Sequence, residues 1–408
     1  MSTADRAAPP APLLSHRPFL LFILGRGFSR FAAQMAVVAM GWQVYALTDS
    51  AFMLGMVGLA QFTPMALLTF LAGHAADRYD RQRVVQICQV AQGLAAALLA
   101  WGSWEGWLTA GTIFAAVMLF GAAAAFESPA SAALLPGVAP RGALQRATAI
   151  STASFQMAVI GGPALSGLLY AAGPAVPYTV MAVFWVLGGM LNGAIVPARE
   201  PGGREPPRLA DLFAGIGFVR GDPAILGTIS LDLFAVLLGG ATALMPIFAR
   251  DILHVGPLGL GVLRACPAVG ALAMTFVLAR RSLRDKVGLR MFQAVIVFGL
   301  ATIVFGLSRH VWLSGLALLV MGAADTISVV IRTSLVQLRT PDAMRGRVGA
   351  VNFLFINASN QLGEFESGVT AALFGAVPAV LIGGAGTVLV AALWMRLFPT
   401  LRDLRRLE

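Results

Sequence analysis

Charged and amide side chains interrupt several long apolar stretches of this chain, and they are its first candidates for chemistry. A charge inside a membrane span costs roughly 2.5–3.5 kcal/mol on insertion scales, so such residues persist mainly where they are paired or functional. The first stretch has Arg26, Arg30 and Gln34 at four-residue intervals, which a helix places in one polar stripe. Other stretches hold the acids Glu127, Asp232 and Asp325. We take all of these as candidate functional residues.

Arg26 and Glu127 are predicted to form a buried pair. Arg26 lies eight residues after Pro18, about 12 Å into its helix, and Glu127 lies nine residues before Pro136, about 13.5 Å into another helix from the same side. Pairing would satisfy two charges that are costly alone. The alternative is that Glu127 hydrogen-bonds a neighbouring serine or meets water.

Three further charged residues, Arg264, Arg332 and Glu364, are expected to act as gate residues or interhelix pairs. Glu364 shares a helical face with a polar set that comprises Asn357, Asn360, Gln361 and Ser367.

The elements that must position these residues are membrane-spanning helices. The chain has 408 residues, of which 58% are hydrophobic and only 12% are charged, and its mean hydropathy is +0.80. A soluble domain is nearer half apolar and a quarter charged. About 20 apolar residues are needed for each span. We expect twelve spans: 18–46, 51–76, 84–104, 108–136, 147–172, 175–196, 225–249, 257–279, 291–308, 311–336, 348–373 and 377–397.

The basic residues fix an orientation. Of the 29 Lys and Arg residues, 24 fall in loops and tails on one side, two (Arg250 and Arg309) fall on the other, and three lie inside spans. Arg332 is counted among the first group. Because cytoplasmic loops carry the excess of positive charge, both termini are expected in the cytoplasm. The net charge of +10 therefore reflects topology and indicates no nucleic-acid partner.

The chain divides into two similar halves. Gly121-Ala122-Ala123 matches Gly322-Ala323-Ala324, and Gly162 and Gly167 match Gly363 and Gly368, all at an offset of 201 residues. A constant register over two helices indicates a parallel repeat. We expect an N-terminal six-helix bundle over 1–196, a cytoplasmic linker with a short amphipathic helix over 197–224, and a C-terminal six-helix bundle over 225–408.

A charged loop follows the second span. Gly73, Ala76, Asp77, Arg78 and Arg81 match G-x-L-A-D-R/K-x-G-R/K-R/K, the loop signature of the major facilitator superfamily, and the whole chain resembles that family. The resemblance implies an all-α fold of twelve transmembrane helices, in which the first, fourth, seventh and tenth line a central cavity. It thereby makes the polar residues of those helices candidates for substrate binding or proton coupling: Arg26, Arg30, Gln34, Glu127, Asp232 and Asp325. It also implies that this loop, with Gly73, Asp77, Arg78 and Arg81, is a cytoplasmic latch, and we expect Asp77 to hold the outward-open state.

Within the family the chain is most similar to twelve-helix bacterial exporters, the branch that includes the enterobactin exporter and macrolide efflux proteins. Residues 42–50, 340–348 and 360–368 carry this likeness. Gly162, Pro163 and Gly167 also resemble a fifth-helix motif of antiporters, although packing of that helix explains them equally well. No basic residue occurs in 108–136, where many proton-coupled drug exporters carry an arginine.

The resemblance implies secondary active transport in a bacterial cytoplasmic membrane, most simply proton-driven export of a small hydrophobic, amphipathic or siderophore-like molecule. The alternative is an uptake symporter for a small polar nutrient. No hydrolytic triad, HExxH or phosphate-binding loop occurs, so we expect no enzyme activity, cofactor or ATP drive. Cys88 and Cys266 fall inside spans and the histidines are scattered, so no disulfide or metal site is expected. We expect a monomer in the lipid bilayer.

Overall fold

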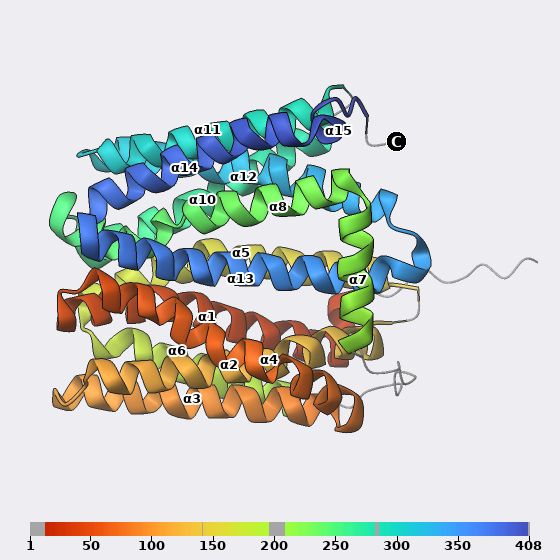
Figure 1. Cartoon of the computed structure of the whole chain (residues 1–408). Coiled ribbons are helices and arrows are strands. Elements are labelled where there is room, and N and C mark those ends of the chain that lie inside the picture. Colours follow the sequence, from red (N-terminus) through yellow and green to blue (C-terminus); the bar gives the residue numbers. More distant parts are fainter. Residues whose placement is uncertain (1–12, 141, 196–208, 282–284, 407–408) are drawn as a thin grey trace, which may run out of the picture.

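The computed structural model describes residues 13–140, 142–195, 209–281 and 285–406. They form long helices that run side by side (Figure 1). The long helices are α1 (Arg17–Thr48), α2 (Ala51–Arg78), α3 (Arg81–Glu105), α4 (Ala110–Val138), α5 (Leu144–Ala172), α6 (Ala175–Gly193), α8 (Pro223–Leu238), α10 (Gly256–Arg280), α11 (Val287–Leu307), α12 (Val311–Arg339), α13 (Asp342–Phe374) and α14 (Ala376–Leu397). Short elements are η1 (Leu13–Ser15), α7 (Leu209–Gly221), η2 (Ala241–Leu244), α9 (Met245–Ile247), η3 (Phe248–Ile252) and α15 (Pro399–Arg402).

Within the described residues, eleven helical segments are long and apolar enough to cross a membrane. The twelfth expected span corresponds to α13, which has 33 residues but a more polar composition. Its amide and acid side chains explain why apolarity alone does not select it. The protein is a multi-pass, all-helical membrane protein, as the sequence predicts.

The helices pack into two groups. Helices α1–α6 pack on one another, chiefly through α3 with α6, α2 with α4 and α1 with α6. Helices α8–α14 pack in the same way, chiefly through α10 with α12, α11 with α12 and α11 with α14. The groups meet along two seams, α5 against α10 and α2 against α13, and α5 and α13 cross the middle of the molecule in Figure 1.

The predicted repeat has a counterpart in packing. Gly121 of α4 lies against the carbonyl oxygen of Gln61 in α2, and Gly322 of α12 lies against the carbonyl oxygen of Pro267 in α10. A side chain at either glycine would collide with backbone, so both positions let two helices approach closely. The two matched glycines thus hold equivalent helix pairs together.

The seventh span is broken, which corrects the continuous helix expected over 225–249. Helix α8 begins at Pro223, where the Asp222 carboxylate accepts hydrogen bonds from the backbone N–H groups of Ala224 (2.8 Å) and Ile225 (3.2 Å). It ends at Leu238, before the pair Gly239-Gly240, and continues as η2, α9 and the π-helix η3. Two consecutive glycines weaken a helix, and Gly240 packs directly on the carbonyl oxygen of Gly363.

Helix α7 lies across the ends of the long helices (Figure 1). It contacts α13 and α8, and its Val219 side chain is buried. The amphipathic segment of the linker therefore packs on the C-terminal group of helices, and residues 196–208 of the linker lie outside the described residues.

Candidate functional site

A central cavity of about 290 Å³ lies between the two groups of helices. Its wall is built from α1, α5, η2, α9, α10 and α12. The polar and charged groups on this wall are Gln34, Thr242, Arg264 and Asp325. Two candidates from the sequence, Gln34 and Asp325, thus face one chamber although they are 291 residues apart. Pro163, from the fifth-helix motif, also lines it.

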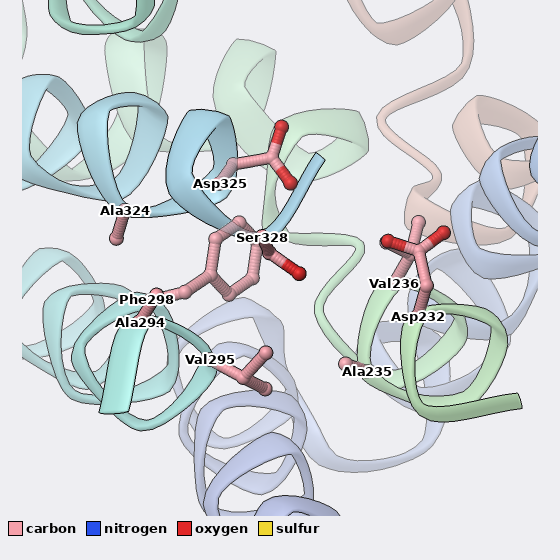
Figure 2. A pocket seen from close by; sticks show the side chains of 9 residues that line it. All are labelled: Asp232, Ala235, Val236, Ala294, Val295, Phe298, Ala324, Asp325 and Ser328. Carbon is pink, nitrogen blue, oxygen red and sulfur yellow. The ribbon is translucent and has the colours of Figure 1, made fainter. Parts of the chain in front are cut away.

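Asp325 borders a second, much smaller cavity of about 10 Å³. This cavity has room for about one water molecule. Figure 2 shows Asp325 and Ser328 on one helix, α12, with the Phe298 ring beside them and Asp232 on helix α8 across the cavity. In the part of the chain that the structure describes, the Asp325 carboxylate has no hydrogen-bond or ion-pair partner. Its charge is therefore not compensated by a direct protein partner.

Asp232 forms a buried ion pair with Arg332 of α12. The two side chains are only 8% and 4% exposed. The position of Arg332 corrects its placement among the cytoplasmic charges, because it lies inside α12 and not in the following loop. A partner for each charge is what permits both to be buried. Asp232 is thus engaged with protein and has its charge neutralised.

Glu127 is held by a network of uncharged donors. Its Oε1 atom accepts hydrogen bonds from Ser29 Oγ (2.8 Å) and from Gln89 Nε2 (2.9 Å). Gln89 Oε1 in turn accepts from Asn192 Nδ2 at 2.9 Å. Four helices, α1, α3, α4 and α6, are joined by these bonds. The carboxylate is thereby stabilised without an arginine.

The predicted Arg26–Glu127 pair is not a direct ion pair in this structure. No Arg26 nitrogen lies within 4.0 Å of a Glu127 oxygen among the ion pairs of the described residues. Instead the Arg26 guanidinium lies 5.7 Å from the Phe22 ring centroid. The Ser29 hydroxyl, about one turn beyond Arg26 on α1, donates a hydrogen bond to the carboxylate that Arg26 was expected to contact.

Arg30 also lies over an aromatic ring. Its guanidinium carbon is 5.3 Å from the centroid of Phe155 in α5. Attraction to a ring face partly replaces the hydration that each guanidinium loses. No described carboxylate lies within 4.0 Å of either Arg26 or Arg30. The first helix therefore offers positive charge that is not consumed by an ion pair.

Arg264 and Glu364 are not in direct contact with each other in the described structure. Arg264 lines the central cavity, and its buried Nε atom has no hydrogen-bond partner among the described residues. The Glu364 carboxylate lies against Gly58 of α2, 2.8 Å from where a β-carbon would stand. Arg332 is the residue of this group that the structure does place in an interhelix pair.

The fifth-helix motif is a packing element at both of its glycines. The β-carbon position of Gly162 lies 2.6 Å from Gln34 Cβ, so α5 contacts α1 there. The β-carbon position of Gly167 lies 2.5 Å from the Pro257 carbonyl oxygen of α10. These close approaches favour the packing explanation of the motif, while Pro163 between them lines the cavity.

At the end of α1, the two groups of helices are joined by a cluster that sequence reasoning missed. Arg250 Nη2 lies 2.5 Å from Asp49 Oδ1, and the Tyr45 hydroxyl donates to Asp251. The Arg250 guanidinium also stacks on the Tyr45 ring at 4.9 Å. The scarcity of charge on the outer side is a signal that could have drawn attention to Arg250.

Close backbone contact closes both seams beside this cluster. Gly55 of α2 meets Gly368 of α13, with 2.7 Å from its β-carbon position to the Gly368 α-carbon. Gly167 and Gly261 meet in the same way between α5 and α10, at 3.1 Å. All four glycines lie within eight residues of the helix ends on this side of the molecule. Space for a side chain is absent at these glycines, so both seams are closed at this end.

The predicted latch loop is described only in part. Helix α2 continues through Arg78 and α3 begins at Arg81, but the surroundings of Gly73 and the side chain of Asp77 lie outside what the structure describes. Asp80 accepts a hydrogen bond from the Gln82 backbone N–H (3.0 Å) and so caps α3.

The sequence profile of the Major Facilitator Superfamily matches residues 22–364. Enterobactin exporter EntS from Citrobacter koseri is 27% identical, with 97% of this chain and 95% of that protein covered. Its counterpart from Escherichia coli K12 is 24% identical with the same coverage.

Solved structures share the fold. A bacterial homologue of the human lysosomal transporter Spinster, inward-facing and occupied, has a TM-score of 0.76 and 13% identity, with 97% of this chain and 99% of that chain covered. An inward-facing bacterial homologue of the iron transporter ferroportin has a TM-score of 0.71 and 18% identity, with 94% and 99% covered.

Proposed function

The chain belongs to the major facilitator superfamily of membrane transporters, and on that premise we propose that it exports a small amphipathic or siderophore-like molecule by secondary active transport. Relatives named as exporters of enterobactin, aligned over nearly the full length of both chains, support this substrate class. The apolar wall of the central cavity, with Met245, Pro267 and Ala268 beside its few polar groups, suits such a solute.

The observation that carries the proposal is a central cavity whose outer side is closed by backbone contacts. Gly55 with Gly368, and Gly167 with Gly261, seal the seams between the two groups of helices. An exporter must bind its substrate from the cytoplasm, so this is the arrangement that it adopts before loading.

Protons are the proposed coupling ion, and Asp325 is the proposed carrier. A carboxylate without a protein partner inside a span is costly when ionised. Protonation removes that cost, whereas Asp232 and Glu127 are already stabilised by Arg332 and by hydrogen bonds. Asp325 faces the substrate cavity directly, so its protonation and the binding of a solute can influence each other.

The proposed mechanism is alternating access by two bundles. Residues 1–196 and 225–408 would rock about the central cavity, with 197–224 as the linker. The distribution of arginines supports a cytoplasmic location for both termini in a bacterial inner membrane. We propose that one chain suffices, since the cavity is enclosed by helices of a single chain.

Transport into inside-out membrane vesicles tests this function, because export from a cell becomes uptake by such a vesicle. Vesicles with an acidic lumen should accumulate radiolabelled enterobactin or ethidium above the level of vesicles without the protein. Collapse of the pH gradient should abolish the accumulation. Accumulation of either compound only in right-side-out vesicles would contradict export.

A further inference from the structure

A groove opens between the inner halves of α5 and α10, on the cytoplasmic side of the central cavity. It has a volume of about 630 Å³ and is lined by eight α5 residues between positions 145 and 160 and by Leu272 of α10. The central cavity begins where the groove ends, at Val159 and Pro163 of α5 and at Ala271 of α10. The two hollows therefore follow one another along a single seam.

One face of α5 forms both the groove and the closed outer seam. Gln145, Thr152, Gln156, Pro163 and Gly167 succeed one another at spacings of seven and four residues, which places them on one side of a helix. At Gly167 this face touches the backbone of α10. At Gln145 and Thr152 it is exposed. Helix α10 therefore diverges from α5 towards the cytoplasm and leaves the inner part of the face uncovered.

The surface of the groove is mostly apolar, and the polar side chains that line it are uncharged. Among its lining residues are Gln145, Thr148, Thr152 and Gln156, interleaved with Ala149, Ala153 and Met157. Polar side chains at membrane depth usually face protein partners or a water-filled space rather than lipid. The Thr148 hydroxyl donates to the Leu144 carbonyl oxygen (2.9 Å), whereas the Gln145 and Gln156 amides have no partner among the described residues.

Two amides can therefore donate to and accept from a solute. The intervening alanines and methionine can cover the apolar part of the same solute.

We propose that this groove is a loading site, where an amphipathic solute with uncharged hydroxyl or amide groups binds from the cytoplasm before it enters the central cavity. The site rests on the export direction proposed above. It precedes the charged chamber at Arg264 and Asp325, so the solute would meet neutral hydrogen-bonding groups first.

A matched pair of threonines tests the loading step. Thr148 and Thr179 are both exposed, and both donate to the carbonyl oxygen four residues earlier, at 2.9 and 3.0 Å. Only Thr148 lines the groove. Thr148→Trp should slow initial uptake of enterobactin by inside-out vesicles about tenfold, equivalent to 1.4 kcal/mol, while Thr179→Trp should leave it near wild type. Equal rates in the two variants would overturn the loading site.

Cysteine labelling provides a readout that does not depend on transport. In a background with Cys88→Ala and Cys266→Ala, Gln156→Cys should react with a charged methanethiosulfonate added from the cytoplasmic side about tenfold faster than Thr179→Cys. Reaction requires a thiolate that the reagent can reach, and Thr179 lies near the start of α6, at the end of the molecule away from the groove. Enterobactin or ethidium should slow the reaction at position 156 alone. Equal labelling, or no protection by either probe, would refute the groove as a binding site. If wild-type vesicles failed to accumulate either probe, the proposed export would be refuted. The labelling experiment would still show whether the groove binds the probe.

Discussion

Arg250 reaches from the C-terminal group of helices to Asp49 of the N-terminal group, with 2.5 Å between Nη2 and Oδ1. Asp49 follows the end of α1, and Arg250 lies in the π-helix that ends the seventh span. π-helical turns are rare and often occur at functional positions. The pair joins the two groups of helices at the end of α1, which is the outer mouth in the proposed orientation. The proposed alternating access requires contacts there that form and break.

Asp49→Asn should weaken closure of the outer mouth. The pair is partly exposed, so its contribution is about 0.2–1 kcal/mol, which changes the ratio of closed to open molecules by at most about fivefold. A cysteine at Thr242, which lines the cavity, should react faster with an impermeant thiol reagent added from outside. Asp403→Asn is the control, since Asp403 also pairs with an arginine, Arg402 (2.8 Å), at the other end of the molecule. An unchanged labelling rate in Asp49→Asn would argue against an outer latch.

Asp232→Asn should destabilise the protein strongly. Removal of one partner from a buried ion pair leaves the other charge uncompensated and costs about 3–5 kcal/mol. The double change Asp232→Leu with Arg332→Met should recover most of that loss, because both charges are then removed. Thermal unfolding of the detergent-solubilised protein measures both effects. Additive losses in the double variant would show that Asp232 and Arg332 do not depend on each other.

Asp325→Asn should uncouple transport from protons. An amide cannot exchange a proton in the accessible pH range, so accumulation driven by a pH gradient should be lost while exchange of internal for external substrate continues. Glu366→Gln is a suitable control, because Glu366 also lies within a long helix, α13, but its carboxylate accepts a hydrogen bond from Thr370 Oγ1 (2.7 Å). Gradient-driven accumulation at the wild-type level in Asp325→Asn would exclude Asp325 as the proton carrier.

Gly167→Val should hold the α5–α10 seam apart on the outer side. Its side chain would meet the Pro257 carbonyl oxygen and the backbone of Gly261. Overpacking of a tight contact costs about 1–3 kcal/mol, which here favours separation of the two groups and an outward-open cavity. Gly111→Ala, where the nearest atom is 3.8 Å away, should have little effect. The expected signature is faster labelling of the cavity from outside, and slower or unchanged labelling would contradict it.

Much of the fold could be predicted from local sequence. Apolar stretches of about 20 residues, ended by caps such as Asp222 and by turns such as Gly106, determine where helices begin and end. Helical spacing also placed Gln34 in a polar stripe, and the structure places it on the cavity wall. The break at Gly239-Gly240 could have been predicted, because two adjacent glycines are poor helix formers. The apolar residues on both sides of the glycines instead suggested one continuous span.

Partners across helices were decided only by tertiary structure. Arg332 and Asp232 are 100 residues apart, and Ser29, Gln89 and Glu127 come from three different helices. The Arg26–Glu127 pair was predicted from the depth of each residue along its helix. Depth gives the height of a residue in the membrane, but it gives neither the direction in which its side chain points nor the residue that it contacts. The sequence thus determines the helices and which polar residues lie within them. Packing determines which charges are neutralised and which, like that of Asp325, remain uncompensated, since that depends on the rotation of each helix against its neighbours.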